Sequence, residues 1–433
     1  MGNTRSTPLT TIRRDRARGG LLGAAAGEAL AAANGGAWAG GTARVIPVAE
    51  LLAAGADVRE KGTRERIAAR WDWWRGSAGG GDRTTSVIPA APAALACLGD
   101  AAELAGVVRP IAALIQHDPD VSDSAVLWCA AIRHAILTRE LDIRAGLQLL
   151  ESSRQRLWSN RFDEAERHDP SACAANGESR GALPRALSTI VHTPIPDDDP
   201  ANGVFRVDHL RNAVQAAVRD GASTEEAAII GGLLGAVYGA SAVPGDWRLT
   251  LRGWPGIRAH SLDALADTII GWAGAERRND TSVNKVQLEG SRHPHDDDLW
   301  IGGVSPYARV TSLLRPGLDV VVTLSEAGDP DPCYGVITLD VRPADFGGDT
   351  VNVDFGLLDT VRVLERLRAD GRAVFVHALL GTGHAVAVGA LYGARRRGIG
   401  IEDALRDVVE ALRRPVDLDD EVRAALYRLA GAA

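Results

Sequence analysis

The chain has 433 residues, of which 45% are hydrophobic and 24% charged, a balance typical of folded globular proteins that excludes wholesale disorder. Its 48 basic and 56 acidic residues give a net charge of −8, which excludes a general electrostatic attraction to nucleic acid or to an anionic membrane. At roughly 150 residues per domain, the length predicts two or three domains, or one large and one small.

Compartment and membrane association are predicted from cysteine usage and apolar runs. The four cysteines are far apart and form no C-x-x-C pair, so neither a disulfide framework nor a zinc finger is expected. The polar, arginine-rich amino terminus has no apolar core of a signal peptide, and a cytoplasmic location follows as the expectation. The longest run without charge or histidine, Ala227 to Gly245, is dominated by Gly and Ala and predicts a buried helix instead of a membrane span.

From Asp15 to about Ala273 the pattern is helical nearly throughout, which predicts an all-α domain over residues 1–275. Apolar residues recur at three- and four-residue spacing in four segments, Val87–Leu98, Ala125–Ile136, Leu183–Ile190 and Leu262–Trp272. Glycine costs about 1 kcal/mol in a helix interior, so the two glycine clusters, Gly19–Gly27 and Gly231–Ala236, need a reason. Very close helix packing is the favoured one, and close approach of a ligand to the backbone is the alternative.

Residues 276–298 are polar, lack periodicity and contain proline, which predicts a linker. The segment ends in His293-Pro294-His295-Asp296-Asp297-Asp298, whose side-chain types suggest metal ligands. Because three adjacent aspartates cannot easily converge on one ion, a solvated linker is the favoured interpretation.

After Trp300 short β-branched runs alternate with helical stretches, which predicts a small parallel α/β sheet within residues 299–433. The expected strands are Val320–Leu324, Val336–Leu339 and Ala373–His377, and the expected helices include Ala385–Arg397 and Ile401–Leu412. The predicted fold is therefore an all-α domain followed by a small α/β domain.

Several blocks of the helical region, in this order, make it resemble the ADP-ribosylglycohydrolase family. They are Arg16–Leu30, Asn176-Gly177, Ala227–Ala236, Ser241–Pro244 and Gly253–Gly256. The resemblance implies a scaffold that holds two magnesium ions about 4 Å apart and cleaves the glycosidic bond to ADP-ribose. In the family, a T-D-D-T motif and a D-x-D-T motif supply carboxylates to the ions.

Both metal motifs are altered in this chain. The first block is Ala39-Gly40-Gly41-Thr42 and the second block is Ala222-Ser223-Thr224-Glu225, so the four family aspartates are absent. Glu28 stands where the opening family motif has an aspartate. A hard divalent cation needs carboxylate oxygens, so the magnesium pair is predicted to be lost, with no metal or other cofactor bound.

The candidate site residues follow from the resemblance and from the remaining acids. Glu28, Glu225 and Asp82 are candidate catalytic residues, because paired carboxylates can serve as acid and base without metal. For Glu225 and its neighbour Glu226 the alternative is a helix-start charge that complements the helix dipole. The candidate ligand-binding residues are Gly40, Gly41, Thr42, Asn176, Gly177, Ser223 and Thr224.

The carboxy-terminal region is similar to dual-specificity phosphatases, whose pattern is a strand, H-C-x5-R and a helix. Here His377 keeps its place, but the cysteine position is Ala378 and the arginine position is His384, so the resemblance implies no phosphatase activity. Gly381 and Gly383 fit a loop whose amides could still bind an anion weakly; the alternative is that His384 caps a surface loop.

Two hypotheses remain from the sequence. The first is a pseudoenzyme that binds an ADP-ribosyl or nucleotide-like small molecule or a protein partner. The alternative is a repurposed, metal-independent enzyme acting on a ribosyl or nucleotide-like substrate in the same cleft. The family implies a glycosidic-bond hydrolase, but the missing metal ligands leave the enzyme question open; neither nucleic acid nor membrane is expected as a partner.

Overall fold

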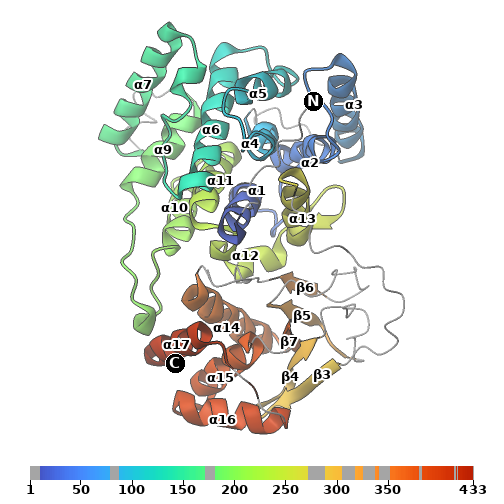
Figure 1. Ribbon diagram of the computed structural model, residues 1–433, viewed down its shortest axis with the longest axis vertical. Helices are drawn as coiled ribbons and strands as arrows, with labels where there is room; N and C mark the ends of the chain where they lie inside the picture. Colours follow the sequence, from blue (N-terminus) through green and yellow to red (C-terminus); the bar gives the residue numbers. More distant parts are fainter. Residues whose placement is uncertain are drawn as a thin grey trace. The chain divides into compact units, whose positions relative to one another are not determined.

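The computed structural model describes residues 10–78, 87–170, 181–271, 288–304, 317–324, 337–340, 352–379, 383–413, 416 and 418–432. The chain divides into two compact units (Figure 1). The helical unit comprises Met1–Ile195, Asp208–Val243 and Thr250–Glu276, and the α/β unit comprises Pro196–Val207, Pro244–Leu249 and Arg277–Ala433. The predicted fold class is confirmed, but two short segments that the sequence assigned to the first domain pack with the second unit.

The helical unit is built from helices of 6 to 22 residues and short 3-10 turns. Its α-helices are α1 (Thr11–Ala32), α2 (Gly40–Ala53), α3 (Lys61–Ala78), α4 (Ala91–Ala96), α5 (Leu104–Ala113), α6 (Pro119–Thr138), α7 (Ser152–Arg167), α9 (Ala182–His192), α10 (Asp208–Arg219), α11 (Thr224–Tyr238) and α13 (Ala259–Ile269). The 3-10 turn η1 (Ile88–Ala90) precedes α4, and the strands β1 (Arg252–Gly253) and β2 (Ile257–Arg258) form a small antiparallel pair. The four segments with helical spacing are confirmed. The first forms η1 and α4, and the other three lie in α6, α9 and α13, in chain order.

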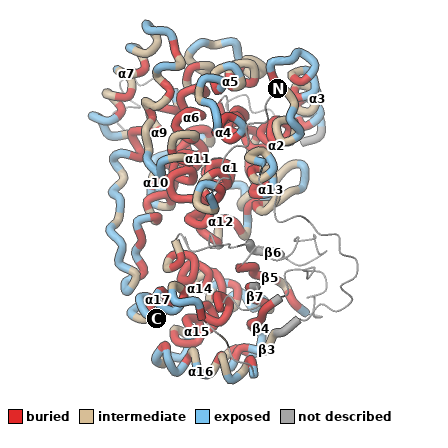
Figure 2. Tube along the Cα trace, viewed as in Figure 1, coloured by how far each residue is buried: buried red, intermediate tan, exposed pale blue. Residues whose placement is uncertain are grey.

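Helices α1 and α11 form the centre of the helical unit, and Figure 2 shows both as buried along most of their length. Their glycines face one another: a Cβ added at Gly23 would overlap the carbonyl of Gly231, and one at Gly19 would overlap that of Gly235. The backbones therefore touch without intervening side chains, which gives the glycine clusters the close-packing role favoured from the sequence. Within the described residues, no helix is long and apolar enough to cross a membrane.

The α/β unit contains a mixed sheet of five strands among the described residues, in the order β3-β4-β7-β5-β6. Its elements are β3 (Leu288–His293), β4 (Asp296–Val304), β5 (Val320–Thr323), β6 (Ile337–Asp340), α14 (Val353–Ala369), β7 (Val374–Leu379), α15 (His384–Arg397), α16 (Ile401–Leu412) and α17 (Asp420–Arg428). β4, β7, β5 and β6 pair in parallel, whereas β3 pairs antiparallel with β4. The three predicted strands and both predicted helices are present.

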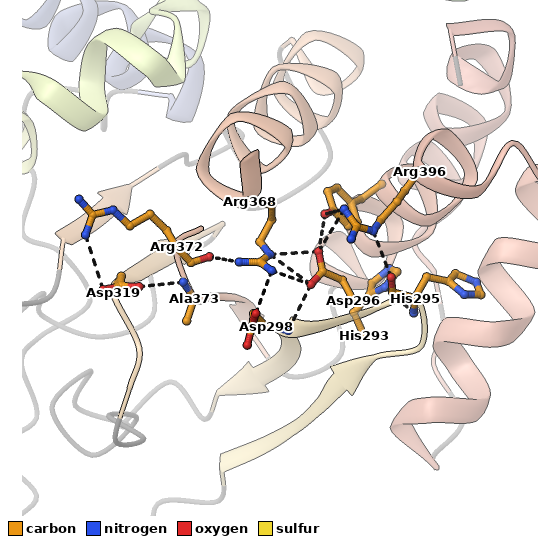
Figure 3. A network of polar contacts seen from close by, with 10 residues as sticks. His293, His295, Asp296, Asp298, Asp319, Arg368, Arg372, Ala373 and Arg396 are labelled. Carbon is orange, nitrogen blue, oxygen red and sulfur yellow. Dashed lines mark hydrogen bonds and ion pairs between the residues drawn. The ribbon is translucent and has the colours of Figure 1, made fainter. Parts of the chain in front are cut away.

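The prediction of a linker over residues 276–298 is wrong from Leu288 onward, because β3 and the start of β4 form a hairpin there. Three of its polar side chains are paired with later helices instead of solvated: His293, His295 and Asp296 (Figure 3). Arg292, Asp297 and Asp298 are exposed, as a solvated segment would have them. Asp296 accepts hydrogen bonds from Arg368 of α14 and, at 2.6 Å, from Tyr392 of α15. His293 bonds through Nε2 to the Gly389 carbonyl at 3.0 Å. Local composition could not show these partners, which come from about 70 to 100 residues further along the chain.

Candidate ligand-binding site

The second half of α1, which carries the opening family block, lies against the starts of α2 and α11, which carry the two altered metal motifs. A Cβ added at Gly27 of α1 would overlap the carbonyl of Ala227 in α11. A Cβ added at Gly41 of α2 would lie 2.6 Å from Oε1 of Glu28 in α1 and 2.8 Å from Cδ1 of Ile88 in η1. The structure thus brings Glu28, the first block and the start of α11 together.

Glu28 is fully buried, and its carboxylate caps the start of α2. Oε1 accepts the Gly41 N–H at 2.7 Å and Oε2 accepts the Thr42 N–H at 2.8 Å. The N-cap residue of α2, Ala39, has no side-chain acceptor, so the carboxylate from α1 satisfies amides that the helix leaves without partners. Burial raises the pKa of Glu28, although the hydrogen bonds from Thr42 and Gly41 act in the opposite direction.

Replacing Glu28 by glutamine is expected to lower the free energy of unfolding by about 2 kcal/mol. The side-chain NH2 of glutamine would face one of the two backbone N–H groups, which then loses its acceptor in a buried place. Glu65→Gln is the control, because Glu65 is an exposed glutamate of α3 whose ion pair with Lys61 contributes at most about 1 kcal/mol. Urea unfolding of the two variants measures the difference, and equal stabilities would contradict the capping role.

Glu225 and Glu226 stabilise the start of α11 through hydrogen bonds to the chain. Glu225 is 9% exposed, and its Oε1 accepts the Val87 N–H at 2.9 Å. Ser223 Oγ accepts the Glu226 N–H at 3.2 Å and donates to Glu226 Oε1 at 2.9 Å, while Arg185 pairs with the same carboxylate. The S-x-x-E spacing of Ser223 and Glu226 is a sequence signature of such a cap that the sequence analysis missed. These contacts support the helix-start interpretation of Glu226, whereas Glu225 connects the start of α11 to the residue that precedes η1.

Four of the predicted site residues lie outside the described residues: Asp82, Asn176, Gly177 and Gly381. Gly40, Gly41 and Thr42 are buried in the first turn of α2. Ser223 is exposed, and Thr224 is half-buried as the first residue of α11. The ligand-binding prediction for these five residues stays a prediction.

The described residues of the two blocks do not fit a pair of magnesium ions. Ala39, Gly40 and Gly41 carry no side-chain oxygen, and both Glu28 oxygens accept backbone N–H groups. Across the described part of the chain, no three His, Cys, Asp or Glu side chains are grouped so that they could hold a metal ion. Two magnesium ions need several convergent carboxylates, which these residues do not supply.

In the α/β unit, the residues that match the phosphatase loop are buried where the structure describes them. His377 is fully buried in β7 and lies 2.9 Å through Nε2 from Thr323 Oγ1 on the neighbouring strand. Ala378 follows in the same strand, and Gly383 takes a φ of +72° as the N-cap of α15. His384 is 2% exposed, so the alternative that it caps a surface loop is wrong.

Comparison with known proteins assigns the family. The ADP-ribosylglycohydrolase family profile matches residues 37–279, more than half of the chain, and the chain belongs to this family. No curated protein sequence matches it.

Solved structures match the two parts of the chain separately. An ADP-ribosylglycohydrolase-related protein complex is 20% identical and covers 60% of this chain and 99% of its own, with a TM-score of 0.43. Human DUSP28 is 23% identical and covers 34% of this chain and 96% of its own, with a TM-score of 0.29. A human tyrosine phosphatase-like serine/threonine/tyrosine-interacting protein is 17% identical. The match covers 33% of this chain and 95% of that protein, with a TM-score of 0.28.

Proposed function

We propose that this chain is a non-catalytic member of the ADP-ribosylglycohydrolase family that binds an ADP-ribosyl or nucleotide-like small molecule without metal. One observation carries the proposal: the carboxylates of Glu28 and Glu225, at the family blocks, are buried and accept hydrogen bonds from backbone amides.

Cleavage of a glycosidic bond needs an acid and a base within hydrogen-bond reach of the substrate, or a water activated by metal. Glu28 is fully buried, and each of its two oxygens already accepts a backbone N–H, so its carboxylate is engaged in holding the start of α2. The glycine contacts between α1 and α11, however, hold the blocks in place. Within the described residues, the family blocks offer no group of carboxylates for metal, and this favours binding without turnover.

A repurposed enzyme is the second candidate, and the raised pKa of Glu28 is the observation that favours it. A carboxyl group whose pKa is raised by burial can act as a general acid near neutral pH. Under this alternative the wild type has turnover, and Glu28→Gln lowers it by a factor on the order of 100 or more. Under the non-catalytic proposal there is no turnover for the variant to lose.

The experiment is a release assay on ADP-ribosylated protein, with free ADP-ribose quantified by mass spectrometry in magnesium and in EDTA. We expect rates equal to those of heat-inactivated protein under both conditions. Elemental analysis of the same preparation is expected to find no stoichiometric magnesium or manganese. Release above the control, or one or two ions per chain, would contradict the proposal.

A further inference from the structure

The turn of the β3–β4 hairpin buries a histidine whose two ring nitrogens are both hydrogen-bonded (Figure 3). His293, the last residue of β3, is 3% exposed. Its Nε2 lies 3.0 Å from the Gly389 carbonyl oxygen in α15, and its Nδ1 lies 3.0 Å from the backbone nitrogen of His295 in the turn. A carbonyl only accepts and a backbone N–H only donates, so Nε2 carries a proton and Nδ1 carries none. The neutral ring, in this one tautomer, is the form that makes both hydrogen bonds.

The packing of α15 fixes the orientation of the His293 ring. The Tyr392 ring meets the imidazole edge to face, with centroids 5.3 Å apart and planes at 90°. A Cβ added at Gly393 would lie 3.2 Å from His293 Cε1, so the helix backbone approaches the ring closely. The ring therefore cannot turn toward other partners unless the hairpin moves away from the helix. Within the described residues His293 belongs to no group that could hold a metal ion, which leaves the hydrogen bonds as its role.

A second proton on the His293 ring would break one of these contacts. Nδ1–H would face the His295 N–H, two donors without an acceptor, and a positive charge would be buried. Burial lowers the pKa of His293 to about 4, and the charges of His295 and Arg396 act in the same direction, whereas the Gly389 carbonyl and Asp296 oppose them. The titratable and charged groups around the hairpin turn come from the hairpin itself, α14, α15 and α16: His295, Asp296, Arg368, Tyr392, Arg396 and Asp407.

We propose that His293 is an acid-sensitive latch, which ties the turn of the β3–β4 hairpin to α15 and releases it when the ring is protonated. The position of β3 suits such a movement. It is at the edge of the sheet and pairs with β4 alone among the described strands, so it can open without breaking the parallel pairs. Because α15 begins at His384, directly after the residues that match the phosphatase loop, the latch acts on the helix that borders this loop.

The direction and the pH range of the effect follow from the two states of the ring. A released imidazole has an ordinary pKa of about 6.5, whereas the pKa of the latched ring is about 4. The released state therefore binds the additional proton more readily, and acidification from about pH 6.5 to pH 4 favours opening. Between pH 7 and pH 4.5 the opening constant should rise on the order of 50-fold. The lowered pKa of Asp296 places the loss of its own contribution mainly below about pH 3.9.

Hydrogen exchange of the full chain at pH 7 and pH 4.5, expressed as protection factors to remove the intrinsic effect of pH, tests the latch. In the wild type, amides of β3 and the start of β4 should lose protection on the order of 50-fold, while amides of α6 in the helical unit keep theirs. His293→Gln can still donate to the Gly389 carbonyl but does not titrate, so the hairpin should be equally protected at both pH values. The matched control is His295→Gln, which keeps the backbone N–H that His293 accepts and should retain the acid-induced loss.

A second measurement on the wild type alone covers the case in which His293→Gln does not fold. In nitrogen-15 NMR spectra at pH 6, the His293 ring, identified by its proximity to the Tyr392 ring, should be neutral with its proton on Nε2. A protonated His293 ring at pH 6 would overturn the inference. So would unchanged hairpin protection in the wild type, or an equal loss in His293→Gln. A loss of the same size in α6 would show that the whole chain opens, and the latch would again be wrong.

Discussion

Replacing Gly23 by alanine is expected to lower the free energy of unfolding by more than about 3 kcal/mol, which is at or beyond the usual range for overpacking. The added methyl group would overlap the Gly231 carbonyl of α11, and a backbone atom cannot move aside as a side chain can. The two helices would have to separate, which loosens the packing on both sides of the contact.

The matched control is Gly76→Ala, on the exposed side of α3. A Cβ added there meets no atom within 4 Å, so this substitution should be neutral or stabilise the helix by up to about 1 kcal/mol. Thermal unfolding followed by circular dichroism measures both variants. A Gly23→Ala protein as stable as the wild type would contradict the close packing of α1 on α11.

Replacing Asp296 by asparagine is expected to destabilise the α/β unit by about 3 kcal/mol at pH 7. The carboxylate is 2% exposed and pairs with Arg368, whose side chain is 10% exposed, so the variant leaves a buried guanidinium without its main partner. Asp298→Asn is the control, because Asp298 contacts the same guanidinium at 3.1 Å but is 62% exposed. Exposed pairs contribute about 0–1 kcal/mol, and the control should change stability by no more than that.

The contribution of Asp296 to stability is also expected to depend on pH. Burial by itself would raise the pKa of Asp296, but hydrogen bonds from Arg368, Tyr392 and the Asp298 N–H hold it below its usual value. A carboxyl group with a lowered folded pKa stabilises the protein above its unfolded pKa of about 3.9 and loses this effect as pH falls through the folded pKa. Urea unfolding between pH 7 and pH 2 should therefore show the wild type and Asp296→Asn converging in acid. A constant difference would contradict this account.

Much of the fold could be predicted because its elements have local signals. The three-residue and four-residue spacing of apolar side chains marks α6 and α9, and β-branched runs mark β5 and β7. The β3–β4 hairpin could not be predicted, because its strands contain polar residues whose partners lie in α14 and α15. A polar segment gives the same local pattern whether its side chains face solvent or a distant helix.

The candidate site was predicted in part. The family resemblance predicted that Glu28 and the block Ala39–Thr42 belong to one site. In the structure, Glu28 accepts hydrogen bonds from the Gly41 and Thr42 N–H groups of this block. The sequence could not show that the Glu28 carboxylate oxygens accept hydrogen bonds from backbone amides. Every residue except proline has a backbone N–H, so the residue types do not indicate which amides need an acceptor. Nor does the run from Trp71 to Trp74 show that Trp73 faces solvent while Trp71 and Trp74 are buried.

Thermal unfolding of the wild-type protein with millimolar ADP-ribose, in EDTA and in magnesium, tests the central claim most directly. Stabilisation follows RT ln(1 + [L]/Kd), so binding with a Kd one hundredth of the ligand concentration adds about 2.7 kcal/mol. We expect the same rise in Tm in EDTA and in magnesium, with ADP-ribose recovered intact. A rise that appears only with magnesium, or no rise under either condition, would contradict metal-independent binding of an ADP-ribosyl ligand.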